Sequence, residues 1–261
     1  MGTLVGLHAH PDDEALMTGG TFARASAEGH RVVLVVATNG DHGETPDDLA
    51  PGETLVDRRR AETERSAAAL GIHRIVWLGY RDSGMQGWEQ NADPASFHQA
   101  PLDEAAGRLA EVLRDEHADA LIVYDWHGNY GHPDHVKVHF VGYRAAELAG
   151  TPAVFEATMN RDEMVRWFEA NESESDWDPR APMDDGNPLG SPESEITLRV
   201  DVSAYTDRKR ASIASHRSQA EDTAWVVEAP EERFTAAFST EWFIERDAPP
   251  GPRDGFVLPE A

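Results

Sequence analysis

Cysteine is absent from this chain of 261 residues. Disulfides, thiolate metal sites and cysteine nucleophiles are therefore excluded. Any metal ion must be held by histidine, aspartate or glutamate, and the chain has 12 histidines and 48 acidic residues to supply them. A chain of this length can bury a sizeable hydrophobic core without covalent cross-links.

Basic residues are also scarce. Lys137 and Lys209 are the only lysines, and the formal net charge is −25. Nucleic acid is a poor partner for such a surface, because phosphate contacts need clustered lysine and arginine. The bias toward acidic residues and arginine fits either a GC-rich coding sequence or adaptation to high salt, where an acidic surface aids solubility.

Long hydrophobic runs are missing too. No apolar stretch approaches the ~20 residues that span a bilayer, so we expect no membrane partner. The first residues lead directly into a short strand, without the basic and apolar segments of a secretory signal. We therefore expect a cytoplasmic protein.

Strand and helix patterns alternate through the first 150 residues. Residues 31–38 form a continuous run of mainly β-branched residues, which is typical of a parallel strand buried on both faces. The predicted strands are 3–9, 31–38, 74–78 and 120–124, and the predicted helices are 14–28, 55–70, 102–117 and a stretch ending near residue 150. This alternation predicts an α/β, Rossmann-like three-layer fold with a mostly parallel sheet and an active site at the carboxyl ends of its strands.

The pattern changes after about residue 159. Residues 160–195 are acidic, contain many serines and prolines and lack periodicity, which predicts a loop or insertion. A strand at 196–202 and a helix at about 205–220 are predicted next, and the tail 247–261 is rich in proline. We expect a catalytic core at 1–159, an acidic insertion at 160–195, and a segment 196–261 that completes the same domain.

The loop after the first strand lacks the glycine fingerprint of a dinucleotide site. No GxGxxG is present there, and neither lysine is preceded by the glycine of a Walker A motif. The loop instead carries His-Pro-Asp-Asp-Glu at residues 10–14. The loop after strand 120–124 carries His-Pro-Asp-His at residues 132–135. In open parallel sheets ligands bind at the carboxyl ends of strands, which is where both motifs lie.

Histidine and carboxylate side chains at two strand ends indicate a metal site. His10 and Asp13 are three residues apart, so in a turn entering a helix both side chains can point one way, whereas Asp12 points elsewhere. One histidine of the second loop would complete three protein ligands and leave the open position of a catalytic zinc site. Iron, cobalt or manganese suit the same donors. The competing interpretation makes Asp12, Asp13 and Asp134 helix caps.

The two loops together resemble the PIG-L/LmbE-like zinc-dependent de-N-acetylases. The resemblance rests on Ala-His-Pro-Asp-Asp-Glu at 9–14 and Tyr-Gly-His-Pro-Asp-His at 130–135. Residues 80–85, Tyr-Arg-Asp-Ser-Gly-Met, also resemble the branch with the mycothiol-biosynthesis deacetylase and the mycothiol S-conjugate amidase. The similarity covers roughly residues 3–150, and beyond it Ala-Ser-His-Arg-Ser-Gln at 214–219 resembles a C-terminal helix of the family.

The resemblance implies a zinc ion held by His10, Asp13 and His135, and hydrolysis of the N-acetyl group of an amino sugar. In that scheme Asp12 is the general base that takes a proton from the attacking water, because proton transfer needs a base within hydrogen-bond reach. Glu14 is interpreted instead as an acidic residue that interacts with the dipole of the helix it begins.

The same resemblance assigns the other site residues. His132 is expected to stabilise the oxyanion or to protonate the departing amine. Asp134 is expected to orient a histidine, and Tyr130 to donate a hydrogen bond to the oxyanion. Arg59 and Asp82 match positions that contact the sugar, although a solvated helix face explains Arg59 equally well.

Two segments depart from the pattern that we expect of the mycothiol branch: Trp-His-Gly-Asn at 126–129 and the acidic region 160–195. His127 is either a further polar contact near the metal or an ordinary loop residue. The favoured substrate is a small N-acetylated, GlcNAc-type sugar, and the alternative is a larger amide such as a mycothiol S-conjugate. A metal- or sugar-binding protein without catalysis is a third hypothesis, which Asp12 beside the ligands disfavours. The chain could also form a homo-oligomer.

Overall fold

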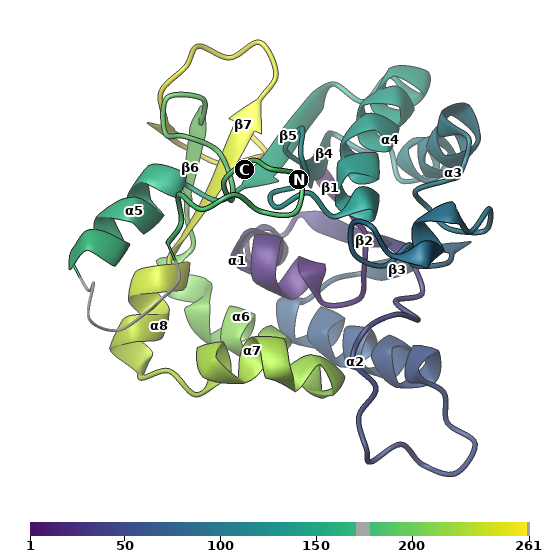
Figure 1. The fold of residues 1–261 in the computed structure, drawn as a ribbon. Helices are drawn as coiled ribbons and strands as arrows, with labels where there is room; N and C mark the ends of the chain where they lie inside the picture. The colour runs from purple at the N-terminus through teal and green to yellow at the C-terminus, as the bar shows by residue number, and fades with distance from the viewer. Residues whose placement is uncertain (171–177, 260–261) are drawn as a thin grey trace.

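A computed structural model describes residues 1–170 and 178–259. Its centre is a set of five parallel strands in the order β3-β2-β1-β4-β5. These strands are β1 (Thr3–His8), β2 (Arg31–Thr38), β3 (Arg74–Tyr80), β4 (Ala120–Tyr124) and β5 (Ala153–Thr158). The predicted α/β fold with a mostly parallel sheet is confirmed (Figure 1).

The last third of the chain extends the same sheet beyond β5. The added strands are β7 (Thr240–Glu245), β6 (Leu198–Asp201) and β8 (Arg253–Asp254), in that spatial order. β7 runs antiparallel to both β5 and β6, whereas β8 pairs with β6 in parallel. The described residues thus form one eight-stranded sheet that is parallel at its centre and mixed at one edge.

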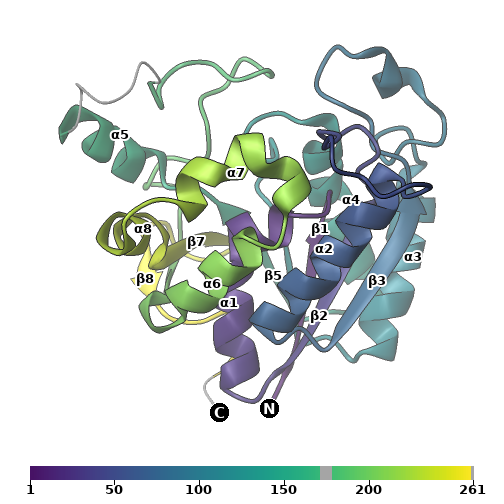
Figure 2. The same ribbon diagram turned by 90° about the horizontal axis from the view of Figure 1, so that it is seen from below.

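Helices cover both faces of the sheet and give the three layers visible in Figures 1 and 2. One face packs against α3 (Leu102–Asp115) and α4 (Pro133–Ala149), and the other against α1 (Asp13–Ala27) and α2 (Leu55–Leu70). Helix α6 (Thr206–Ile213) packs in turn against α1 and α2. The remaining α-helices are α5 (Arg161–Ala170), α7 (Ala220–Val227) and α8 (Glu231–Phe238), and short 3-10 turns occur at Glu89–Ala92, Ser203–Tyr205 and Arg217–Gln219. Across the described ranges, no helix is long and apolar enough to cross a bilayer.

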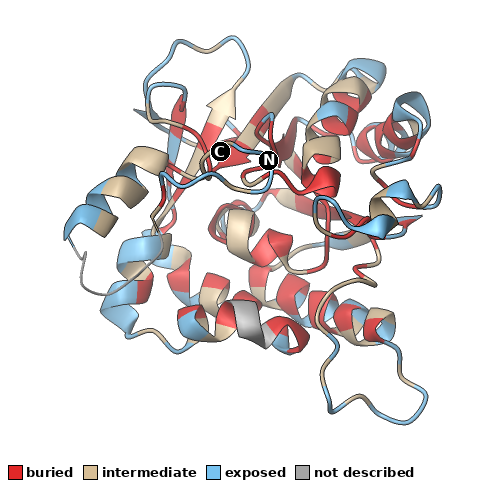
Figure 3. Ribbon diagram, in the orientation of Figure 1, coloured by how far each residue is buried: buried red, intermediate tan, exposed pale blue. Residues whose placement is uncertain are grey.

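The two-sided packing explains the continuous apolar runs of the central strands. On β1, Leu4 belongs to the cluster beneath α1, whereas Val5 and Leu7 belong to the cluster beneath α3 and α4. Because successive side chains point to opposite faces, a strand covered on both sides needs apolar residues at every position. The buried residues accordingly concentrate on the central strands and the inner faces of the helices (Figure 3).

Local capping chemistry fixes the ends of α2 where the sequence predicts them. Thr54 accepts a hydrogen bond from the backbone N–H of Asp57, and the carboxylate of Asp57 accepts one from the N–H of Thr54. This reciprocal pair satisfies two N–H groups that the first turn of a helix leaves free. At the other end Gly71 has φ 74°, a left-handed conformation that costs glycine little.

The last third differs most from the expected elements. Residues 160–195, expected to be an acidic loop, begin with α5, while 171–177 lie outside the described residues. The helix expected at about 205–220 ends earlier, because the chain turns at Ala214–His216 and places polar side chains inward. Strands β5 and β7 and helices α7 and α8 are additional elements that the sequence pattern does not single out.

Candidate metal and catalytic site

The two His-Pro-Asp loops follow β1 and β4, which are neighbours at the centre of the sheet. Strand order reverses between these two strands, and ligands of open parallel sheets bind in the crevice at such a point. Each loop leads straight into a helix: Asp12 is the N-cap of α1 and His132 is the N-cap of α4. The topology therefore brings the two sequence motifs to one place.

Three side chains with metal-binding atoms, those of His10, Asp13 and His135, lie close together there. Nδ1 of His10 lies 3.2 Å from Nε2 of His135. The carboxylate of Asp13 lies 3.5 Å from that His10 nitrogen and 3.4 Å from the His135 nitrogen, through different oxygens. A tetrahedral zinc ion with bonds of about 2.0–2.1 Å needs donors roughly 3.3 Å apart, and each of these three distances is close to that value.

His10 also faces two further carboxylates through its other nitrogen. Nε2 lies 3.4 Å from Asp82 and 3.4 Å from Asp134. Burial alone would lower the pKa of His10, but Asp82, Asp13 and Asp134 together raise that pKa well above its usual value. The negative potential that favours a proton on His10 also favours a metal cation beside it.

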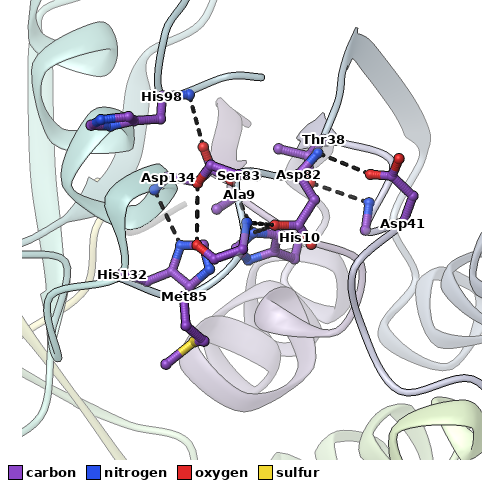
Figure 4. A network of polar contacts seen from close by, with 12 residues as sticks. Ala9, His10, Thr38, Asp41, Asp82, Ser83, Met85, His98, His132 and Asp134 are labelled. Atoms are coloured by element: carbon purple, nitrogen blue, oxygen red, sulfur yellow. Dashed lines mark hydrogen bonds and ion pairs between the residues drawn. The ribbon is translucent and has the colours of Figure 1, made fainter. Parts of the chain in front are cut away.

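The described residues contain two overlapping groups of possible metal ligands, and within each group the donor atoms all lie within 4.8 Å of one another. The first group is His10, His132 and His135, and the second is His10, Asp82, His132 and Asp134. The carboxylates of the second group are already engaged. Asp134 accepts the backbone N–H of Ser83 through one oxygen and that of His98 through the other, each at 2.8 Å. Asp82 accepts the N–H of Gly84 at 2.8 Å. These backbone contacts hold Asp82 and Asp134 beside His10, where their carboxylates can orient its ring (Figure 4).

His132 lies edge-on to His10, with ring centroids 4.5 Å apart. Its Nδ1 accepts the backbone N–H of Asp134 at 3.1 Å, so a neutral ring carries its proton on Nε2. Burial, together with the charges of His10 and His135, lowers the pKa of His132 to about 2. Tyr130 completes this side of the site, with its hydroxyl 3.4 Å from Nε2 of His135.

Asp12 has an unusual backbone conformation, with φ 113°. Non-glycine residues rarely adopt positive φ, and such strain persists only where surrounding contacts hold it. Its side chain is 18% exposed, and Oδ2 accepts a hydrogen bond from Arg59 at 3.0 Å. Burial raises the pKa of Asp12 to about 6, against the opposing charge of Arg59. Arg59 is itself buried, so its contact with a sugar stays a prediction.

Glu14, interpreted from the sequence as an acidic residue that interacts with the dipole of α1, is fully buried at the start of that helix. One carboxylate oxygen accepts hydrogen bonds from Ser66 at 2.5 Å and His216 at 2.8 Å. The other oxygen accepts the backbone N–H of Asp12 at 3.0 Å. Burial alone would raise the pKa of Glu14, but the charge and hydrogen bond of His216 outweigh it and lower that pKa.

Two further histidines lie beside the site: His8, which the sequence did not single out, and His127, for which two interpretations were open. His8, two residues before His10, is buried between the hydroxyls of Tyr124 and Thr18, each 2.9 Å from a ring nitrogen. His127 lies 3.2 Å from the carboxylate of Asp185 and 3.2 Å from the carbonyl of Gly190, so it connects the site loop to the acidic region. The His-x-His spacing of His8 and His10 was the feature of the sequence that could have placed His8 near the site. Nothing local in the sequence points to the partner of His127.

Fold and site together define an α/β protein with a buried cluster of histidine and aspartate side chains, a group that could hold a metal ion, at the carboxyl ends of its parallel strands. The family described as PIG-L, GlcNAc-PI de-N-acetylase, matches residues 5–146. The chain belongs to the PIG-L family, which confirms the resemblance drawn from the two His-Pro-Asp loops.

Curated relatives share this similarity over most of their length. The 1D-myo-inositol 2-acetamido-2-deoxy-alpha-D-glucopyranoside deacetylase of Thermobispora bispora is 38% identical over 234 residues, covering 82% of this chain and 78% of the relative. The protein of the same name from Thermobifida fusca is 39% identical, covering 82% of each chain. Among solved structures, N,N'-diacetylchitobiose deacetylase from Pyrococcus horikoshii matches with a TM-score of 0.59 and 25% identity, covering 93% of this chain and 83% of that one.

Proposed function

We propose that this protein is a zinc-dependent hydrolase that removes the N-acetyl group from an amino sugar. The observation that carries the proposal is the triangle of His10, Asp13 and His135, whose donor atoms lie 3.2–3.5 Å apart beside Asp12. These three residues are the proposed zinc ligands. A bound zinc ion would supply a Lewis acid that lowers the pKa of water and polarises the acetyl carbonyl.

Asp12 is the proposed general base. Its carboxylate is partly exposed toward solvent, and Arg59 fixes one of its oxygens. A base works best when its pKa is close to the working pH, and burial brings the pKa of Asp12 to about 6. Asp12 can therefore take the proton of the attacking water and then pass it to the departing amine.

His132 and Tyr130 are the proposed donors to the oxyanion. Because Nδ1 of His132 accepts the N–H of Asp134, the Nε2–H group of the neutral ring is free to donate. This hydrogen bond supports a role for His132 as a donor to the oxyanion, and protonation of the departing amine is the alternative role. Asp134 would keep the ring of His10 in place. Asp82 would either help Asp134 to orient this ring or contact the sugar.

The proposed substrate is an N-acetylglucosamine unit joined to a second polar ring. The named relatives support this choice, since both curated deacetylases are named for an acetamido sugar on inositol and the Pyrococcus horikoshii enzyme for diacetylchitobiose. The acidic region carries Asp185 next to the site loop and would help to select the group attached to the sugar.

The test is release of free amine from N-acetylglucosaminyl inositol, diacetylchitobiose and a bulky N-acylated thioether conjugate by the purified protein. We expect turnover of an acetylated sugar, loss of turnover after dialysis against a chelator, and recovery with added zinc.

Asp12→Asn should reduce kcat roughly 1,000-fold, within the ~100- to 10,000-fold contribution of a general base, and should retain the metal. Turnover of the conjugate alone would reassign the enzyme as an amidase. Full activity without metal would refute the mechanism.

A further inference from the structure

The last third of the chain reaches the catalytic loop through one buried histidine. His216 lies in the turn after α6, is 1% exposed, and contacts the carboxylate of Glu14 through Nε2 at 2.8 Å. This histidine lies outside residues 5–146, the part that matches the family. The two partners are separated by 202 residues of sequence, so only the fold brings them together.

Glu14 transmits this contact to Asp12. Its second carboxylate oxygen accepts the backbone N–H of Asp12 at 3.0 Å. That N–H belongs to the residue with φ 113°, which needs fixed partners to stay in so strained a conformation. Rotation of the Glu14 carboxylate would remove the acceptor and let the backbone of Asp12 relax. The direction in which Asp12 points therefore depends on how firmly Glu14 is held.

His216 and Ser66 are the two side chains that hold the other oxygen of Glu14 among the described residues. Ser66 also shares a hydrogen bond with Ser212 at 2.6 Å, so its hydroxyl serves two neighbours. His216 is the basic side chain that contacts this oxygen among the described residues. Asp12, Asp13 and Glu14 are consecutive carboxylates, and a buried carboxylate without a positive or hydrogen-bonded partner is strongly disfavoured.

We infer that His216 is a positioning residue for the general base, acting through Glu14 on the backbone of Asp12. This inference rests on the proposed function, in which Asp12 is the base. It assigns the C-terminal segment a part in catalysis. The turn after α6 holds Asp12, the strained residue between β1 and α1, in the orientation that the general base requires. His216 does not itself touch the substrate or the proposed metal ligands in this assignment.

The experiment compares His216→Ala, His216→Gln and Ser212→Ala in the zinc-loaded protein. Removing the imidazole should lower kcat roughly tenfold, a part of what a general base contributes, with KM and bound zinc unchanged. His216→Gln keeps an N–H donor facing Glu14 and should recover most of the rate. Ser212→Ala is the matched control, since it empties a buried polar contact nearby without removing a donor from Glu14.

Hydrogen exchange of the Asp12 amide, followed by NMR, is the second readout and needs no turnover. It should speed up in His216→Ala and stay slow in His216→Gln and Ser212→Ala. A folded His216→Ala protein with normal kcat and normal Asp12 exchange would overturn the inference, as would a loss in His216→Gln equal to that in His216→Ala. If His216→Ala does not fold, Ser66→Ala removes the other donor to the same oxygen and should give the same pattern. An inactive parent protein would refute the proposed function, while the amide exchange still tests the positioning.

Discussion

One guanidinium nitrogen of Arg59 lies 3.0 Å from Oδ2 of Asp12, and the same nitrogen donates to the backbone carbonyl of Pro11 at 2.5 Å. The other terminal nitrogen donates to the carbonyl of Gly40 at 2.9 Å. Arg59 therefore connects the loop after β1 to the loop after β2 and holds the side chain of Asp12 at their junction. Arg59, which was expected to contact the sugar, therefore also holds the proposed general base, Asp12, in position.

Arg59→Lys should lower kcat roughly 100-fold while leaving KM and metal content near those of the parent, as expected when a general base is misplaced. The physical reason is geometric: one ammonium group cannot serve two carbonyls and a carboxylate as a planar guanidinium does. Steady-state kinetics with metal analysis checks this. Arg60→Lys is the control, because Arg60 is exposed and lies over the ring of Trp77. A rise in KM with unchanged kcat would instead make Arg59 a sugar contact.

Asp134→Asn should weaken zinc binding by roughly 10- to 100-fold, the usual cost of losing a residue that orients a metal-binding histidine. The substitution removes negative charge 3.4 Å from Nε2 of His10 and replaces an oxygen that accepts a backbone N–H. Competition with a chromophoric chelator measures the affinity. His98→Ala is the control, since Asp134 contacts only the backbone N–H of His98. Equal affinities for parent and Asp134→Asn would argue against the orienting role.

Lys209→Met should destabilise the fold by about 3–5 kcal/mol, because it leaves the buried carboxylate of Glu241 without its cation. The two side chains are 2% and 3% exposed and lie 2.6 Å apart. Glu241 also accepts the backbone N–H groups of Gly20 and Thr21 within α1, so the pair ties α6 and β7 to that helix. Urea unfolding measures the effect. The double variant Lys209→Met/Glu241→Gln should be more stable than Lys209→Met, and the opposite order would contradict the assignment.

Glu156 should make the folded protein less stable as pH rises through neutrality. Burial raises the pKa of this carboxyl to about 7, against a hydrogen bond from Tyr143. A folded pKa above the unfolded value gives stability that is present below the unfolded pKa of about 4.3 and is lost as pH rises through about 7. Glu156→Gln should remove this dependence. Between pH 4 and pH 8 its free energy of unfolding should therefore rise by up to roughly 3 kcal/mol relative to that of the parent. Urea unfolding at several pH values tests it, and parallel stability curves would contradict it.

The parallel sheet could be predicted because its signals are local, and the two loops that carry the proposed metal ligands stand out in the sequence for the same reason. The β-branched run of β2 and the two His-Pro-Asp loops each depend on residues close in sequence. Because the carboxyl ends of neighbouring parallel strands lie at the same edge of a sheet, the two loops could be expected to form one site. The role of the C-terminal third was less accessible, because β7 and α7 have no clear period in the sequence and their packing partners include residues far away in the chain.

The two His-Pro-Asp loops remain the part of this protein that the sequence by itself determined: their residue types, their positions at strand ends and the kind of metal site they suit. Tertiary structure alone decided which buried groups hold them. His216 reaches Glu14 across 202 residues, and Arg59 reaches Asp12 across 47. Such pairs leave no periodic or spaced pattern, because their partners are chosen by the packing of α1 against α2 and α6 and not by neighbours along the chain.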